Sequence, residues 1–171
     1  MQVQCCTIMP LNPVQNQETS IIRKATANDI DAIVEIEKKC FSPPTAYSKP
    51  QLTYLILKAK STCLVETTLG VLRGFIIVLY RKRSLVGAIE TIDVDHSCRS
   101  QGIGLKLLAA AEADMKNRGM KTSQLEVSER NEAAIKLYQK AGYTIKGRLI
   151  NYYKFDHCGT RHAIRMVKAL N

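Results

Sequence analysis

The sequence predicts a single mixed α/β domain in which helices pack on one sheet. Three observations support this fold class. The chain has 171 residues, an ordinary length for one domain. Apolar residues make up 46% of it and charged residues 23%, a composition typical of a globular protein. Apolar strand-like segments also alternate with segments of helical period, and no internal repeat is visible.

The N-terminal part is expected to hold a tail, one strand and two helices. Residues 1–19 are polar, contain two prolines and show no periodicity, so we expect a tail there and one folded domain over 20–171. Thr26 and Ser48 are each followed three residues later by a side chain that can complete a capping box. In order, the predicted elements are a strand over 21–25, a helix over 26–40 and a second helix that begins at Ser48.

The rest of the chain alternates strands and helices. Helical spacing is clearest where Ile103, Leu107, Ala111 and Met115 form one apolar stripe, and Gly142 is placed to end a later helix. In order, the predicted elements are strands over 63–66, 71–80 and 86–94, a helix over 103–117, a strand over 125–127, a helix over 131–141, and a final hairpin over 143–153 and 161–167.

Charge and cysteine content narrow the class of protein. The net charge of +10 suits a phosphate-rich cofactor, a nucleic acid or an acidic assembly. Six cysteines without a CxxC pair favour free thiols in a reducing cytosol. The apolar run 75–80 is too short to span a bilayer, and the first twenty residues lack the basic start of a secretory signal, so we expect a cytoplasmic protein. No spacing matches a common zinc pattern, so we expect no metal.

Residues 99–104, RSQGIG, follow an apolar strand and open a helix. Two glycines would let the backbone approach a ligand closely, and the free N–H groups of a helix start attract an anion. The alternative is a turn that needs two glycines only for steric reasons, and the loop alone leaves both open. Leu107 stands where a dinucleotide fingerprint needs glycine, and the Gly-Lys-Ser/Thr of a P-loop is absent.

A longer series of motifs resembles the GNAT superfamily of acetyl-CoA-dependent N-acetyltransferases. The series is IDV (92–94), RSQGIG (99–104), LKLLAAAEADMKNRG (105–119), LEV (125–127) and NEAAIKLYQKAGY (131–143). The tail from Asn151 resembles the RimI-like branch, which acetylates protein N-termini. The resemblance implies a mostly antiparallel, curved mixed sheet of about seven strands with four helices, splayed between the fourth and fifth strands.

The resemblance also implies which residues hold acetyl-CoA. A strand segment would pair with the pantetheine arm, and a loop would cradle the pyrophosphate, although Gln101 stands where relatives often carry a basic residue. The alternatives are a plain core strand and, for Asn131, a helix cap. The implied residues are Ile92, Asp93, Val94, Arg99, Ser100, Gln101, Gly102, Ile103, Gly104, Leu105 and Asn131.

Two residues are implied to be catalytic. Glu126 matches the carboxylate that serves as general base for the incoming amine, and its alternative is a solvated or ion-paired glutamate. Tyr138 matches the residue that protonates the leaving thiolate, and its alternative is a core aromatic. Asn131 and Tyr138 are seven residues apart, which places them on one helix face.

Glu37, Tyr152 and Tyr153 are implied to line the substrate groove, and the two tyrosines could equally be strand aromatics packed on the sheet. The loop 41–47 lacks the Trp that RimI-like enzymes often carry, which leaves the peptide specificity open.

The predicted function is transfer of acetyl from acetyl-CoA to a primary amine, most simply a protein N-terminus, by direct attack in a ternary complex. Acetylation of a small amine or a lysine side chain is the alternative within the same fold. A basic RNA- or ribosome-binding module is the alternative from another class, but no RNA-binding aromatic motif or Lys/Arg tract supports it. We therefore expect no direct nucleic-acid or membrane partner, and a monomer or homodimer.

Overall fold

The computed structural model describes residues 19–171. The tail expected over 1–19 lies outside the described residues except for Thr19, and so do Cys5 and Cys6. In the described part of the chain, no helix combines the length and the apolar character that crossing a bilayer requires.

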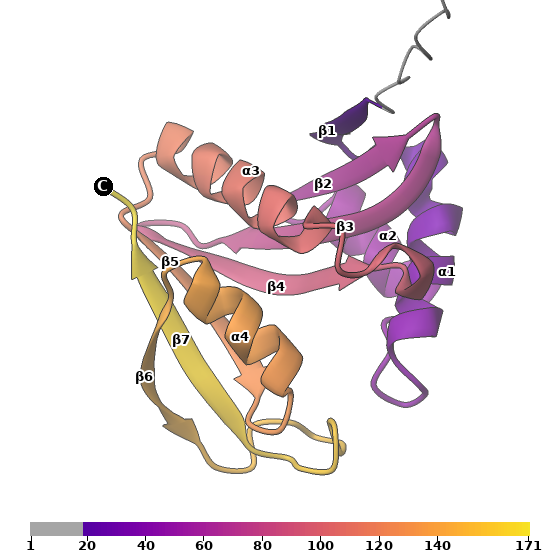
Figure 1. The fold of residues 1–171 in the computed structure, drawn as a ribbon. Helices are drawn as coiled ribbons and strands as arrows, with labels where there is room; N and C mark the ends of the chain where they lie inside the picture. The colour runs from indigo at the N-terminus through magenta and orange to yellow at the C-terminus, as the bar shows by residue number, and fades with distance from the viewer. Residues whose placement is uncertain (1–18) are drawn as a thin grey trace, which may run out of the picture.

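The elements follow the predicted order (Figure 1). Two short 3-10 turns, at 27–29 and 96–98, precede the first and third helices. The elements are β1 (Ser20–Lys24), α1 (Ile30–Cys40), α2 (Lys49–Leu57), β2 (Ser61–Thr68), β3 (Val71–Tyr80), β4 (Val86–Val94), α3 (Ile103–Asn117), β5 (Thr122–Ser128), α4 (Glu132–Lys140), β6 (Thr144–Leu149) and β7 (Ala163–Ala169).

Both predicted capping boxes are present. The Thr26 backbone N–H donates to the Asp29 carboxylate at 2.7 Å, and the Ser48 backbone N–H donates to the Gln51 side chain at 2.9 Å. Each box satisfies backbone groups that a helix start would otherwise leave without a partner. These local signals explain why the first two helices begin where the sequence predicts.

One seven-stranded sheet runs through the molecule in the order β1-β2-β3-β4-β5-β7-β6. All neighbours are antiparallel except β4 and β5, which are parallel. Figure 1 shows α3 on one side of the sheet and α1 with α2 on the other. The mixed sheet with four helices confirms the predicted fold class.

Two apolar cores lie on opposite faces of the sheet. Along β3, Ile76 and Val78 face the core under α3 and α4, whereas Phe75 and Ile77 face the core under α1 and α2. Because both faces are covered, the strand is apolar throughout instead of alternating with polar residues. The continuous run FIIVL is therefore explained by burial on two sides.

The predicted final hairpin is wrong in its boundaries. β6 ends at Leu149 rather than continuing to Tyr153, and a connection over 150–162 leads to β7. A small turn inside it pairs His157 with Thr160. Aromatic residues in this connection suggested a strand, but they pack on one another above the cleft described below.

Candidate active site

A cleft opens where β4 and β5 stop pairing. The parallel register ends at Ile89 opposite Leu125, whereas β4 continues to Val94 and β5 to Ser128. Between the parted strands lies a cleft of about 1120 Å³, with further walls from α1, α4, the loop before α3 and residues 152–158. An extended ligand can pair with the backbone of β4 along this stretch as an added strand would.

A bulge bends β4 at the point where it leaves β5. Thr91 pairs with Ile77 and Ile89 pairs with Val78, which leaves Glu90 as the extra residue. A bulge increases the local twist and redirects the strand. The sequence analysis missed Glu90, because an extra residue inside an apolar strand leaves no mark in a two-residue period.

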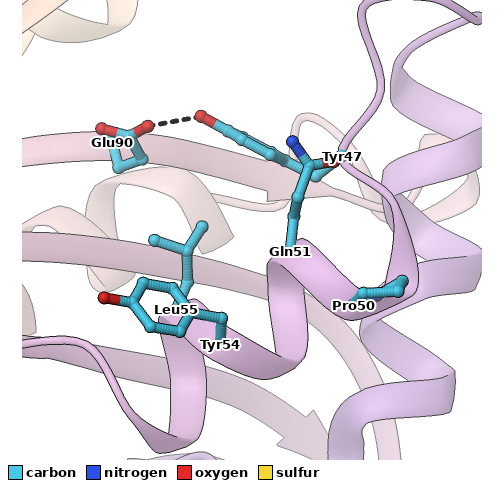
Figure 2. A pocket seen from close by; sticks show the side chains of 6 residues that line it. All are labelled: Tyr47, Pro50, Gln51, Tyr54, Leu55 and Glu90. Atoms are coloured by element: carbon cyan, nitrogen blue, oxygen red, sulfur yellow. Dashed lines mark hydrogen bonds between the residues drawn. The ribbon is translucent and has the colours of Figure 1, made fainter.

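Glu90 also forms a wall of the cleft together with Tyr47. Figure 2 shows the Tyr47 hydroxyl pointing at the Glu90 carboxylate, to which it donates a hydrogen bond. The same two residues line a second hollow of about 350 Å³ beside α2, whose other walls are Pro50, Gln51, Tyr54 and Leu55. The Tyr47–Glu90 contact therefore separates the two hollows.

The loop before α3 has the geometry of an anion site. Ser100 and Gly102 have φ angles of 62° and 76°, in the left-handed region, and α3 begins at Ile103. A Cβ built on Gly102 would meet no atom within 4 Å, so the space beside the loop is open. The amide groups of the first turn carry the positive end of the helix dipole. This cradle has the geometry to receive a phosphate or diphosphate group.

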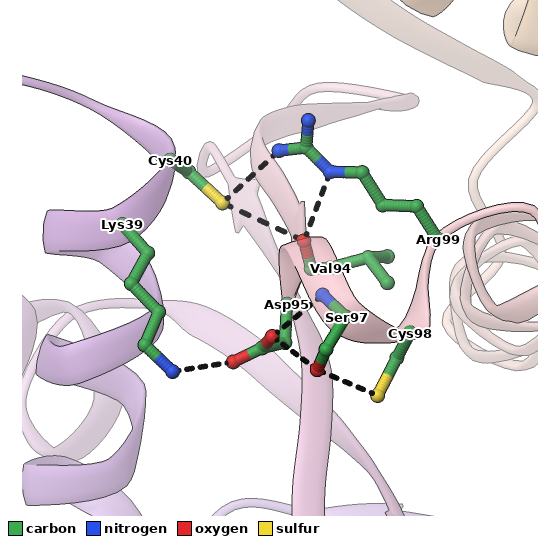
Figure 3. Close-up of polar contacts among 7 residues, drawn as sticks. All are labelled: Lys39, Cys40, Val94, Asp95, Ser97, Cys98 and Arg99. Atoms are coloured by element: carbon green, nitrogen blue, oxygen red, sulfur yellow. Dashed lines mark hydrogen bonds and ion pairs between the residues drawn. The ribbon is translucent and has the colours of Figure 1, made fainter.

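Arg99 adds a positive charge at the end of β4 (Figure 3). Its Nε donates to the Val94 carbonyl oxygen at 3.4 Å, and its Nη2 lies 3.6 Å from the Cys40 Sγ. Lys136 and Lys140 of α4 also line the cleft. These three cations would help the loop to hold a phosphate-rich molecule.

Two predicted cofactor residues direct their side chains elsewhere. The Gln101 Oε1 accepts a hydrogen bond from the Arg73 Nη1 at 3.2 Å, and Ile103 is buried in the core under α3. The other predicted cofactor residues line the cleft: Ile92, Asp93, Val94, Arg99, Ser100, Gly102, Gly104, Leu105 and Asn131.

Asn131 at the N-cap of α4 and Tyr138 within α4 both line the cleft, as their spacing predicts. The Asn131 Oδ1 caps the helix by accepting from the Ala134 N–H at 3.1 Å. Tyr138 is buried, and its ring contacts Tyr143 edge to face. Burial, and next the charge of Asp93, raise the pKa of the Tyr138 hydroxyl above its usual range. Tyr138 is therefore protonated at neutral pH.

Glu126 points into the cleft from β5 as an ion-paired carboxylate. Its Oε1 accepts from the Arg165 Nε at 2.7 Å and from the Gln124 Nε2 at 3.0 Å. Arg165 lies opposite it on the neighbouring strand β7. Glu126 is thus ion-paired, which the sequence analysis gave as the alternative, and it also lines the cleft.

Tyr152 and Tyr153 line the cleft from the connection after β6. Their rings meet edge to face at 5.0 Å between centroids, and Tyr153 stacks on His157 at 4.2 Å. His162 instead accepts a hydrogen bond from the Asn151 N–H through its Nδ1. Among residues 19–171, no group of three His, Cys, Asp or Glu side chains is arranged to hold a metal ion.

Glu37 and Asp93 form a buried pair of carboxyl groups at the cleft wall. Glu37 is fully buried rather than exposed in a groove, and Asp93 is 4% exposed. The two carboxyls lie within hydrogen-bonding reach of each other. Burial and, second, the charge of Glu37 raise the pKa of Asp93 to about 8, and burial also raises the pKa of Glu37. The sequence analysis assigned each residue a separate role and missed the pair.

The charges that line the cleft differ by element. The strands and α1 contribute carboxyl groups, whereas the loop before α3 and α4 contribute the cations described above. The carboxyl-bearing residues on these elements are Glu37, Glu90, Asp93 and Glu126. One cleft of a strongly basic protein thus offers an acidic side to a cation and a basic side to an anion.

The parted parallel strands and the amide-lined start of α3 define a mixed α/β domain whose cleft opens beside an anion site. A model of the acetyltransferase (GNAT) family matches residues 30–143, which is more than half of the chain. The chain therefore belongs to the GNAT acetyltransferase family.

Individual relatives match over shorter stretches. An aligned segment of 75 residues is 37% identical to N-alpha-acetyltransferase 30 of Schizosaccharomyces pombe and covers 44% of this chain and 50% of that protein. A segment of 59 residues is 36% identical to a mycothiol acetyltransferase of Thermobispora bispora. It covers 34% of this chain and 20% of that protein. The alignments thus span half or less of these relatives.

A solved structure matches over nearly the whole chain. The ribosomal-protein-S18-alanine N-acetyltransferase from Escherichia coli superposes with a TM-score of 0.78 at 25% identity, covering 90% of this chain and 95% of that one. This match is longer than the segment over residues 30–143 that the family model covers.

Proposed function

We propose that this protein transfers the acetyl group of acetyl-CoA to a primary amine, and that the amine is the N-terminal α-amine of a protein. The observation that carries the proposal is the cleft between β4 and β5, which places a protonated Tyr138 and a carboxylate, Glu126, around one space. The named activities of the S. pombe and E. coli relatives support an N-terminal acceptor.

Acetyl-CoA would supply the activated acyl group as a thioester. The loop over 99–105 would hold its diphosphate through backbone N–H groups, and β4 over 92–94 would bind its pantetheine arm. The Val94 N–H is our candidate donor to the thioester carbonyl oxygen, where negative charge develops during attack.

Two side chains would move protons during direct attack. Tyr138 would give its hydroxyl proton to the leaving sulfur, which its raised pKa permits at neutral pH. Glu126 would take the proton that the nitrogen loses as the C–N bond forms, directly or through water. No covalent acyl-enzyme is required, so Cys98 at the cleft wall has no assigned role.

A small amine is the second candidate acceptor. The 36% identity over 59 residues to a mycothiol acetyltransferase favours it, since that relative is named for a different activity from the N-terminal enzymes. A peptide and a small amine would both bind with the amine at the acidic side of the cleft. We place the enzyme in a reducing compartment, in keeping with four free cysteines among the described residues.

The test is a thiol-release assay with acetyl-CoA and a panel of acceptors: N-terminal peptides, peptides with a blocked N-terminus and a free lysine, polyamines and small amino compounds. We expect turnover with at least one free N-terminal peptide. Tyr138→Phe should lower kcat by about 10²-fold, the usual effect of removing a general acid.

Tyr54→Phe is the matched control. Tyr54 is an exposed residue of α2 and does not line the cleft, so its variant should keep the wild-type rate. Release of thiol only with polyamines or lysine would contradict the N-terminal acceptor. Full activity of Tyr138→Phe would contradict the proton-transfer role.

A further inference from the structure

The Glu37–Asp93 pair is held rigidly from both sides. The Glu37 Oε1 accepts from the Tyr47 backbone N–H at 2.8 Å, and the Asp93 Oδ2 accepts from the Thr91 hydroxyl at 2.9 Å. The first bond joins α1 to the loop after it, and the second lies within β4. The second oxygen of Glu37, Oε2, is buried and has no donor among the described groups.

Two carboxyl groups that face each other require a proton between them. Both are acceptors when ionised, and two buried like charges in contact repel strongly. In the part of the chain described by the structure, neither carboxyl forms an ion pair with Lys or Arg. One shared proton supplies the missing donor for Glu37 Oε2 and leaves the pair with a single negative charge.

The surroundings of the pair contain few other titratable groups. On α1, the Cys40 thiol lies against Asp93, and on α4, Tyr138 senses the charge of Asp93. From the loop after α1, Tyr47 senses the charge of Glu37. Arg99 reaches Cys40 but makes no ion pair with either carboxyl. A change in the protonation of the pair therefore changes the pKa of the Tyr138 hydroxyl.

Glu126 is a different kind of carboxyl. Arg165 matches its charge, so protonating Glu126 would break an ion pair. The Glu37–Asp93 pair can instead gain a second proton or lose it without breaking a contact to a cation. The pair therefore presents a negative charge that no Lys or Arg side chain among the described residues neutralises.

We propose that the Glu37–Asp93 pair takes up the proton that the acceptor ammonium must lose before its nitrogen can attack. This inference rests on the proposed function and adds a second proton acceptor to it. An ammonium has no lone pair, and the single negative charge of the pair both attracts the cation and accepts its proton through the cleft.

The protons and electrons of the step balance. The pair takes one N–H proton, and the lone pair thus freed forms the bond from nitrogen to the acetyl carbon. The carbon–sulfur bond breaks with its electrons on sulfur, which Tyr138 protonates. The second N–H proton passes by way of Glu126 to restore Tyr138. The pair then returns its proton to solvent, which is the one proton that the overall reaction releases.

The pair keeps its shared proton at neutral pH. The pKa of Asp93, about 8, describes the loss of that proton, so the form of the pair that would accept a proton from the ammonium is the singly charged one.

The test compares Asp93→Asn and Glu37→Gln with Glu35→Gln, a control on the exposed side of the same helix. With the best acceptor peptide, both pair variants should lower kcat by about 10²-fold, while KM for acetyl-CoA stays within roughly twofold. Added imidazole should restore part of the lost rate in Asp93→Asn, because an external base replaces the missing one. Glu35→Gln should match the wild type with and without imidazole.

A second measurement needs no turnover. The infrared spectrum of the wild type at pH 7 should contain the carbonyl band of a protonated carboxylic acid, and Asp93→Asn and Glu37→Gln should lack it. Absence of this band from the wild type would overturn the shared proton. Wild-type turnover in both pair variants would overturn the proton-acceptor role. If the wild type acetylates no amine but keeps the band, the proposed function fails while the shared proton stands.

Discussion

Three carboxyl groups that line the cleft differ in what surrounds them. Glu126 accepts hydrogen bonds from two donors, one of them Arg165, with which it forms an ion pair. Asp93 and Glu37 are buried next to each other, and together they carry a single negative charge. Because the groups are chemically alike, their neighbours alone decide which one holds a proton at neutral pH.

The raised pKa of Asp93 makes stability depend on pH. An unfolded Asp has a pKa of about 3.9, so below that value both states are protonated and the group has no effect. Between about pH 3.9 and about pH 8 the unfolded chain has lost the Asp93 proton that the folded chain keeps. The free energy of unfolding therefore falls as the pH rises through this range. Each pH unit contributes at most about 1.4 kcal/mol to the free energy of unfolding.

Asp93→Asn should remove this dependence. We expect the difference in Tm between the variant and the wild type to shift in favour of the variant from pH 5 to pH 8. Thermal unfolding followed by circular dichroism at matched ionic strength measures it. A difference that stays constant with pH would show that Asp93 does not hold a proton in the folded protein.

At the scale of elements, the cleft depends on how closely α3 packs on β3. A Cβ built on Gly74 of β3 would lie 2.8 Å from the Asp93 carbonyl oxygen and 3.2 Å from the Ile103 side chain. Only a residue without a side chain lets the start of α3 and the end of β4 come together there. The glycine thus helps to position both the anion loop and the carboxyl pair.

Gly74→Ala should destabilise the fold by about 1–3 kcal/mol, the usual cost of overpacking a core. Urea unfolding measures the change. Gly147→Ala is the control, because a Cβ at this strand glycine of β6 would meet no atom within 4 Å. Equal stability of the two variants would mean that the contact at Gly74 relaxes without cost.

Across the whole molecule, the net charge of +10 is not spread evenly. Carboxyl groups gather on the α1, β4 and β5 walls of the cleft, while the cations that line it come from the α3 loop and α4. A nucleic acid would meet those carboxylates, whereas acetyl-CoA needs only the basic side for its phosphates.

Acetyl-CoA should therefore raise the Tm of the protein, and a short RNA of equal phosphate concentration should not. At 100 times its Kd a ligand stabilises the folded state by about 2.7 kcal/mol, which a thermal-shift assay detects easily. The shift should shrink with added salt, since phosphate contacts are screened. Stabilisation by RNA alone would favour the binding-module alternative over an enzyme.

The order of the elements, the helix caps at Thr26 and Ser48 and the glycine loop were predictable because each depends on neighbours in the sequence. The bulge at Glu90 and the end of β6 at Leu149 were not, because strand partners across the sheet decide them. The same holds for Gln101, whose side chain is drawn away from the cleft by Arg73 on β3.

What the sequence determined by itself is the set of local structures: periodicity sets helix faces and strands, and small residues set the turn that exposes backbone amides to an anion. What the tertiary structure decided is which side chains meet. Glu37 and Asp93 are 56 positions apart, and no local pattern relates them. They share a proton only because α1 packs against the end of β4, where burial removes the water that would otherwise solvate both carboxylates in their charged forms.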